Sequence, residues 1–324
     1  MNRRTFLAVL SSGLLAGPLA AEAKQAKVPR IGVLIPSMAG EQSAYLLALR
    51  DGLRELGYAE GQNLILEYRW AEYRNDRWAE LAADLVASKV DMILSPLGSA
   101  TVAARRVTTT IPIVIMANAD VVEQGFVPSL SRPGAQITGV VILSSEIVGK
   151  RFELLRDVLP RAKRVAYLHV ARFGQHEKNA AEQAGQRLGI QVESLEVRSL
   201  TDVEGVLQAA IRNSAAGVVV GSAPLFHRDN FEIVRLLNAR RLPAIFFDPG
   251  FPRAGGLMAY GASIPEVWRR AAYFVDRILR GAKPEDLPIE QPTKFDFVIN
   301  LKTATALGLT IPPSLLARAD EVIQ

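Results

Sequence analysis

The sequence predicts an α/β protein made of two doubly wound lobes, each with a parallel sheet. Residues 90–120 alternate a buried strand, a turn, a helix and a second buried strand, which is the pattern of a βαβ unit. Residues 216–250 repeat that order about 120 residues further along. The length of 324 residues also exceeds a typical single core. One large doubly wound enzyme domain with insertions is the alternative, but repetition at the half-chain scale favours two lobes.

The first 23 residues predict an export signal rather than a part of the fold. Arg3 and Arg4 precede an apolar run at residues 6–15, and a small-residue cleavage site follows at residues 21–23. The arginine pair resembles a twin-arginine signal, and an ordinary secretory signal fits equally well. The sequence has no cysteine, which excludes disulfides and a lipid anchor on cysteine. We therefore expect a protein that is free in a bacterial periplasm and is not inserted in the membrane after cleavage.

The distribution of charge argues against a nucleic-acid partner. The formal net charge is +5, but lysines and arginines are interspersed with nearly as many acids. No helix-turn-helix, zinc-finger or aromatic RNA-binding motif accompanies the basic residues. A mildly basic, solvated surface is the simpler interpretation.

Strands and helices alternate through the first half of the chain. The predicted strands are apolar or alternating runs bounded by turn residues, and the predicted helices carry apolar residues at a helical period. Tyr45, Leu49 and Leu53, for example, share one face of a helix that stops at Gly57. We expect the first crossing between the lobes near residues 141–145. The predicted strands are residues 30–35, 63–70, 91–95, 113–117 and 136–143, and the predicted helices are residues 41–56, 76–87 and 100–107.

The second half repeats this alternation. In its long helix at residues 265–280, Val267, Ala271 and Phe274 are in phase. Because more than one strand joins the two lobes, we expect them to move as a hinge. The predicted strands are residues 164–170, 191–197, 217–220, 244–247, 255–260 and 294–300; the predicted helices are residues 148–158, 175–188, 203–213, a single helix between 224 and 243, 265–280 and 303–308.

Polar turns follow corresponding strands in the two halves, at the carboxyl ends where open α/β sheets bind ligands. Ser99 and Ser222 stand in two such turns, and Asp120 and Asp248 stand just past the next strands. We expect Ser99 and Thr101 to cap a helix, and the helix N-termini near Ser99 and Ser222 to hold a carboxylate. The two aspartates either cap turns or hold an ammonium group. The sequence leaves both interpretations open.

No catalytic or metal-binding motif competes with ligand binding. His169 and His176 lack the spacing of a helical metal pair, and His227 stands alone. The sequence has no G-x-S-x-G elbow, P-loop or dinucleotide-binding glycine motif, and neither serine has a local base. We therefore expect no metal, no cofactor and no enzymatic activity. Aromatic residues near strand ends should mostly pack in the core, although one or two could stack on a ligand; these are Phe173, Phe226, Phe247, Phe251 and Tyr260.

Short motifs occur in a specific order along the chain. They are IPIV at 111–114 with Asp120 and Gly125, SLSRPG at 129–134, ITGV at 137–140, LPAI at 242–245, GGLM at 255–258, YG at 260–261, FVINL at 297–301 and ALGL at 306–309. In this order they resemble the ABC transporter substrate-binding family that is related to tryptophan- and tyrosine-uptake binding proteins. The resemblance covers about residues 30–312. The family usually has a proline after the first aspartate, whereas Val121 follows Asp120 here.

The resemblance implies a type I periplasmic-binding-protein-like fold whose lobes are joined by a multi-strand hinge with three crossings. Lobe 1 would comprise residues 28–142 and 263–281, and lobe 2 residues 144–261 and 290–324. The resemblance, together with the polar turns, places a ligand at strand ends. The implied ligand-binding residues are Ser37, Met38, Gly98, Ser99, Ala100, Asn118, Asp120, Phe173, Ser222, Pro224 and Asp248.

The function that follows is the solute receptor of an ABC importer. We expect a monomer that captures a small organic solute, such as an amino acid or an aromatic acid, by hinge closure. The protein would deliver this solute to an inner-membrane ABC permease. Two alternatives keep the export signal: a ligand sensor for a membrane kinase or chemoreceptor, and an exported α/β enzyme that uses Ser99.

Overall fold

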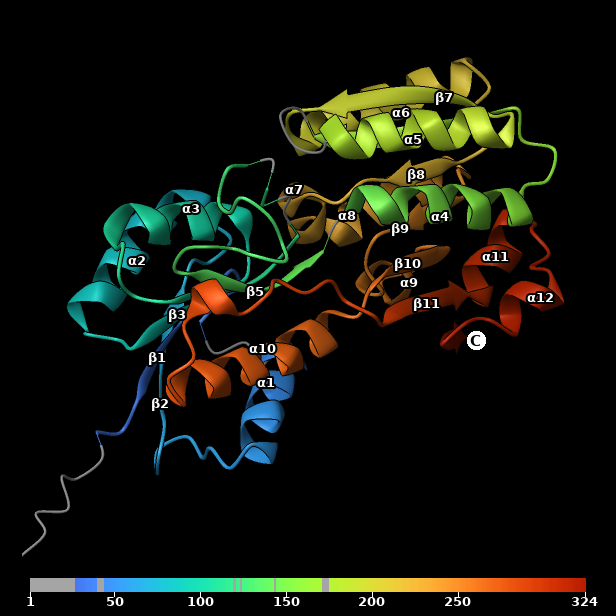
Figure 1. Cartoon of the computed structure of the whole chain (residues 1–324). Coiled ribbons are helices and arrows are strands. Elements are labelled where there is room, and N and C mark those ends of the chain that lie inside the picture. The colour runs from blue at the N-terminus through green and yellow to red at the C-terminus, as the bar shows by residue number, and fades with distance from the viewer. Residues whose placement is uncertain (1–26, 40–43, 119–120, 123, 143, 171–174) are drawn as a thin grey trace, which may run out of the picture.

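The first sheet carries the polar turns of the first half of the chain, including the turn of Ser99. The computed structural model describes residues 27–39, 44–118, 121–122, 124–142, 144–170 and 175–324. In these residues the first sheet has the order β2-β1-β3-β4-β5, and its strands are parallel (Figure 1). Its strands are β1 (Arg30–Ile35), β2 (Ile65–Trp70), β3 (Met92–Ser95), β4 (Ile113–Asn118) and β5 (Ile137–Ile142).

The second sheet carries the polar turns of the second half of the chain, including the turn of Ser222. Its strands are β6 (Arg164–Val170), β7 (Gln191–Val197), β8 (Val218–Val220), β9 (Ala244–Phe246), β10 (Met258–Ala262), β11 (Phe295–Asn300) and β12 (Glu321–Ile323), in the order β12-β11-β10-β9-β8-β6-β7. The strands from β6 to β10 are parallel, whereas β11 pairs antiparallel with β10 and parallel with β12. The predicted fold class, two α/β lobes with parallel sheets, is confirmed. The short strand β12 was not predicted.

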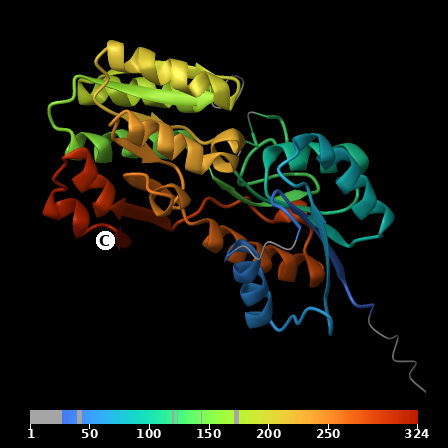
Figure 2. The same cartoon turned by 180° about the vertical axis from the view of Figure 1, so that it is seen from behind.

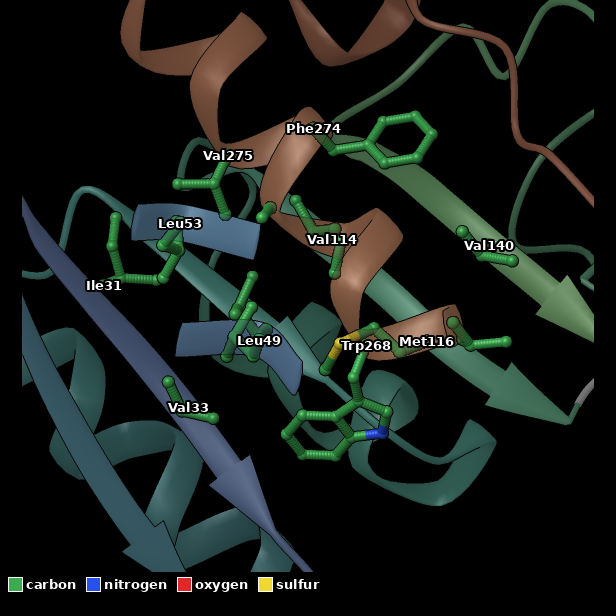
Figure 3. Close-up of a cluster of buried hydrophobic side chains, with 14 of the residues drawn as sticks. Ile31, Val33, Leu49, Leu53, Val114, Met116, Val140, Trp268, Phe274 and Val275 are labelled. Atoms are coloured by element: carbon green, nitrogen blue, oxygen red, sulfur yellow. The ribbon is translucent and has the colours of Figure 1, made fainter. Parts of the chain in front are cut away.

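Helices cover both faces of the first sheet. α1 and α10 lie on one face, and α2 and α3 lie on the other. Figure 3 shows Trp268 of α10 next to Leu49 of α1 over the strands, with Phe274 of α10 on the side of Val140 of β5. The two helices approach closely at Gly52, where an added Cβ would lie 2.8 Å from the Arg269 carbonyl oxygen. The elements are α1 (Ala44–Glu55), η1 (Asn75–Arg77), α2 (Trp78–Ala87), α3 (Gly98–Val107), α10 (Ile264–Leu279) and η2 (Pro284–Asp286).

The second sheet is also enclosed by two helical layers. α4, α5, α11 and α12 pack on one face, and the helices α6 to α9 pack on the other, which faces the viewer in Figure 2. The predicted single helix between residues 224 and 243 is wrong, because the chain breaks at Asp229 into α7 and α8. The elements are α4 (Ser144–Val158), α5 (Gln175–Leu188), α6 (Leu200–Arg212), α7 (Pro224–Arg228), α8 (Asn230–Ala239), α9 (Gly250–Arg253), α11 (Leu301–Leu307) and α12 (Pro313–Leu316).

The chain passes between the two sheets from β5 to α4, from β10 to α10, and again before β11. Hydrogen bonds join these connections to one another and to the first sheet. Ser263 N donates to Lys294 O at 3.0 Å, and Val141 N donates to Glu290 O at 2.8 Å. The Glu290 carboxylate also binds the Arg270 guanidinium through two contacts of 2.7 Å. The connections therefore lie side by side as one structure.

Candidate functional site between the two sheets

The strand order brings the predicted turns of each sheet to one edge. Leu94 of β3 pairs with Val33 of β1 and with Val114 of β4, so the carboxyl ends of these three strands are neighbours. In the second sheet β6, β8 and β9 are likewise adjacent and parallel. The turns after these strands carry the predicted ligand-binding residues. The carboxyl ends of these strands therefore lie together at one edge of each sheet.

Tyr45 interacts electrostatically with residues of the second sheet's strand ends. This residue lies in the first turn of α1, just after the β1 turn, and its ring is 6.1 Å from that of Trp268. Burial raises the pKa of the Tyr45 hydroxyl, the Asp248 carboxylate raises it further, and Arg253 opposes the shift. Asp248 and Arg253 follow β9 of the second sheet. Residues next to the first sheet therefore interact electrostatically with residues that follow β9 of the second sheet.

Asp248 combines a structural contact with a buried charge. The residue is 6% exposed, and its Oδ1 accepts a hydrogen bond of 2.7 Å from Gly250 N. Its Oδ2 lies 3.7 Å from His227 Nε2, and the His227 ring meets the edge of Phe247 at 5.2 Å. His227, which has no second histidine near it in the sequence, therefore lies next to an acidic side chain in the structure. One carboxylate oxygen holds the turn, as the structural interpretation predicts, and the carboxylate as a whole interacts electrostatically with Tyr45.

A strained loop holds the turn after β1. Glu72 and Tyr73 have φ angles of 53° and 59°, in the left-handed region that costs energy for residues other than glycine. Glu72 N donates to Ser37 O at 3.2 Å, and Tyr73 N donates to Pro36 O at 2.6 Å. Met38, which follows Ser37 in the sequence, is 47% exposed. The strained backbone after β2 thus holds Pro36 and Ser37 in place.

The turn after β3 differs from the expected capped helix. α3 begins at Gly98, and its N-cap residue Leu97 makes no side-chain capping bond. The Thr101 hydroxyl lies inside the helix, where it contacts Ser95 Oγ at 2.8 Å and donates to Leu97 O at 3.1 Å. The prediction that Ser99 and Thr101 cap this helix is therefore wrong. Ser99 is exposed in the first turn, and the neighbouring Ala100 is fully buried.

The turn after β8 is held from within the second lobe. Ser222 N donates to Glu177 Oε2 at 3.0 Å, and Pro224 then begins α7. α7 spans five residues, so few peptide dipoles align in it and its N-terminus attracts an anion weakly. α3, with ten residues, aligns more peptide dipoles than α7 does.

The remaining predicted residues are only partly placed. Asn118 ends β4 and pairs with Ile142 of β5. Asp120 and Phe173 lie outside the described residues. The aromatic residues Phe226, Phe247 and Phe251 are buried in the core, as expected. Sequence analysis missed Tyr45, Tyr73 and Arg253 as residues of this edge; the signal available for Tyr45 was its place in the first turn of the helix after β1.

Two surface hollows lie at the opposite edges of the sheets. One, of about 420 Å³, is lined by Pro29, Tyr58 and Asp91, next to the amino ends of β1 and β3. The other, of about 890 Å³, is lined by Lys163 and Pro312 among others, near the amino end of β6. Neither hollow contains a predicted ligand-binding residue.

His169 is a buried histidine rather than a member of a metal site. It is 6% exposed, and its Nε2 lies 2.7 Å from Ser194 Oγ. Its ring stacks on Tyr167 at 5.5 Å. Within the part of the chain that the structure describes, no group of three or more His, Cys, Asp or Glu side chains could hold a metal ion.

Acid should weaken the fold partly through His169. Burial lowers the pKa of this imidazole, an effect that Glu196 opposes and Lys178 supports. An unfolded histidine titrates near pH 6.5. Below about that pH the unfolded state binds the proton more readily than the folded state, so this contribution to stability is lost as pH falls. We expect the melting temperature to fall less between pH 7.5 and 5.5 in His169→Gln than in the wild type.

Ser194→Ala provides the control for this comparison, since it removes the hydrogen-bond partner and keeps the imidazole. In this variant the melting temperature should fall between pH 7.5 and 5.5 as much as it does in the wild type. An unchanged pH dependence in His169→Gln would show that His169 does not contribute.

Comparison with known proteins identifies the family. Residues 36–323 match the family described as ABC transporter substrate binding protein. The Tyrosine-binding protein of Clostridioides difficile (strain R20291) is 25% identical over 287 residues, which cover 85% of this chain and 78% of that protein.

Solved structures share the fold. A conserved domain protein from Vibrio cholerae superposes with a TM-score of 0.82 at 24% identity, covering 91% of this chain and 100% of that one. A Streptococcus pneumonia ABC domain in complex with L-Trp superposes with a TM-score of 0.81 at 22% identity, covering 91% of this chain and 99% of that one. The ligand-free, open structure of a substrate binding protein from Clostridium difficile has a TM-score of 0.72 at 19% identity, covering 92% of this chain and 100% of that one.

Among the described residues, no helix has both the length and the apolar character needed to cross a bilayer. The family match spans most of the chain, and the structure has the two lobes that such proteins require. The chain therefore belongs to the family of ABC transporter substrate-binding proteins, which bind small molecules outside the cytoplasm and deliver them to an ABC permease.

Proposed function

We propose that this protein captures an amino acid between its two lobes and delivers it to an inner-membrane ABC permease. The observation that carries this proposal is the Asp248 carboxylate, which is 6% exposed in the turn after β9 and interacts electrostatically with Tyr45 of the first sheet's layer. A buried carboxylate within electrostatic range of an aromatic side chain suits a ligand that has both an ammonium group and an apolar or aromatic side chain.

The chemistry of the edge suggests how an amino acid would be held. Asp248 supplies the negative charge for the ammonium group. The first turn of α3, at Gly98 and Ser99, supplies backbone N–H groups for the carboxylate. Tyr45 and the 44%-exposed Tyr73 supply aromatic surface for a side chain. The names of the relatives, a tyrosine-binding protein and an L-Trp complex, support an aromatic amino acid.

Capture would proceed by closure of one lobe on the other. The lobes we propose comprise residues 28–142 with 263–281, and residues 144–261 with 290–324. The ligand would contact the turns of both lobes in the closed state and the turns of one lobe in the open state. Since this difference in affinity is what shifts the population, ligand binding would favour closure.

The same proposal covers location and assembly. The signal-like residues 1–23 support export by the Sec or twin-arginine route into a periplasm. We propose a monomer that binds its ligand without metal, cofactor or chemical conversion.

A thermal-shift screen of the purified protein tests the proposal. The probes are the twenty amino acids and their aromatic acid analogues. A ligand at about 100 times its Kd stabilises the folded state by about 2.7 kcal/mol, which raises the melting temperature. We expect at least one aromatic amino acid to do so, with calorimetry confirming one bound molecule per chain. Absence of any shift across the screen would overturn the amino-acid assignment.

A further inference from the structure

A buried polar cluster lies beneath the second-lobe turn. Glu177, in the first turn of α5, is 4% exposed. Its Oε2 accepts a hydrogen bond from Tyr167 Oη at 2.7 Å and another from Ser222 N at 3.0 Å. One carboxylate oxygen therefore links the strand β6, the helix α5 and the turn after β8.

The turn lies directly on this cluster. An added Cβ at Gly221 would lie 2.5 Å from Tyr167 Oη and 3.1 Å from Glu177 Oε2. Gly221 N also donates to Leu168 O at 2.9 Å, which holds the turn against the end of β6. Glycine is needed here because a side chain would lift the turn from the carboxylate.

Arg151 supplies a buried positive charge to the same region. The residue is 2% exposed, and its Nε donates to Tyr260 O on β10 at 2.8 Å. Its Nη1 has no hydrogen-bond partner. Burial lowers the pKa of Arg151, and Glu177 is near enough to raise it. The cluster thus extends from the ligand turn to the strand that leads into the second connection between the lobes.

Stability alone gives a weak reason for such a cluster. Removing charges from water is costly, and well-packed apolar residues often stabilise a protein as much as a buried ionic group does. A carboxylate has a more specific property, since its hydrogen bond to a backbone N–H is about twice as strong as a neutral one. Such a bond fixes the direction of the Ser222 peptide.

We propose that Glu177 is the positioning residue of the second-lobe ligand turn. It binds the Ser222 N–H and thereby sets the position from which the turn meets the ligand in the closed state. This inference rests on the proposed function, because it concerns the same interlobe site. Glu177 itself is buried beneath the turn and acts through Ser222.

Three variants test this role. Glu177→Met removes the acceptor at similar side-chain length, Glu177→Gln keeps an acceptor oxygen, and Tyr167→Phe removes the other donor while leaving the Glu177–Ser222 bond. Affinity for L-tyrosine and L-tryptophan is measured by calorimetry, and ligand-free stability by thermal unfolding. We expect Glu177→Met to weaken binding by roughly tenfold or more, while Glu177→Gln and Tyr167→Phe bind within about threefold of the wild type.

A spectroscopic measurement makes the test independent of folding yield. The amide proton of Ser222 should shift upfield in Glu177→Gln, since its partner is then neutral. Equal affinity in Glu177→Met and the wild type would overturn the inference, as would equal weakening in Tyr167→Phe, because the cluster would then be merely structural. If Glu177→Met fails to fold, an unshifted Ser222 amide in Glu177→Gln overturns it. A wild type that binds no amino acid overturns the proposed function instead, together with this inference.

Discussion

Gly139→Ala should destabilise the protein by about 3 kcal/mol or more, since it forces both a steric overlap and a strained backbone. Gly139 lies in β5, paired with Ile115 of β4, and has a φ of +131°. An added Cβ would lie 2.2 Å from Ile115 O and 2.6 Å from Ile115 N. These are backbone atoms of a central strand, so they cannot move aside as a flexible side chain can. Thermal unfolding of the ligand-free protein measures the effect.

Gly205→Ala is the matched control. Gly205 lies within α6, and an added Cβ there would meet no atom within 4 Å. Alanine favours a helix by about 1 kcal/mol relative to glycine, so this variant should melt slightly higher than the wild type. If Gly139→Ala has the same melting temperature as the wild type, β4 and β5 can separate to admit the methyl group without loss of stability.

Asp248→Asn should weaken amino-acid binding by roughly 30-fold or more, which corresponds to about 2 kcal/mol for loss of a buried charged partner. The amide keeps an oxygen that can accept the hydrogen bond from Gly250 N, so the turn should survive. The charge that we assign to the ligand ammonium group is lost. Calorimetric titration with L-tyrosine and L-tryptophan gives the Kd, and thermal unfolding without ligand tests whether the fold is intact.

Asp229→Asn is the control for the charge itself. Asp229 belongs to the same lobe, between α7 and α8, and pairs with Arg228 at 2.7 Å. Its loss should leave the Kd unchanged. If Asp248→Asn binds as tightly as the wild type, Asp248 serves only to cap its turn, and the ammonium group must be held elsewhere.

The fold was predictable because its signals are local. Residues 30–35 and 164–170 are apolar runs that become β1 and β6, and the phased residues Val267, Ala271 and Phe274 do face the first sheet. The strand β12 was missed because a three-residue strand has too few side chains to show a period. The break at Asp229 was missed because the apolar pattern continues through both α7 and α8.

The ligand edge was predictable in outline and not in its contacts. The parallel arrangement places the turns of Ser99 and Ser222 at the carboxyl ends of their strands. However, the sequence does not show that Thr101 bonds Ser95, or that Glu177 holds Ser222, since these depend on side-chain direction and on segments far apart in the chain. The electrostatic interaction of Tyr45 with Asp248 depends on how the two sheets are placed relative to each other, which no local pattern encodes.

The side-by-side connections have a mechanical consequence. A single strand between two bodies resists neither bending nor twisting, whereas parallel connections joined by Ser263–Lys294 and Val141–Glu290 resist torsion far more than flexion. We therefore expect the second lobe to move along a single arc when it closes and to return along the same arc. A transporter that must recognise the closed, ligand-bound conformation would then meet the same protein surface whichever ligand is bound.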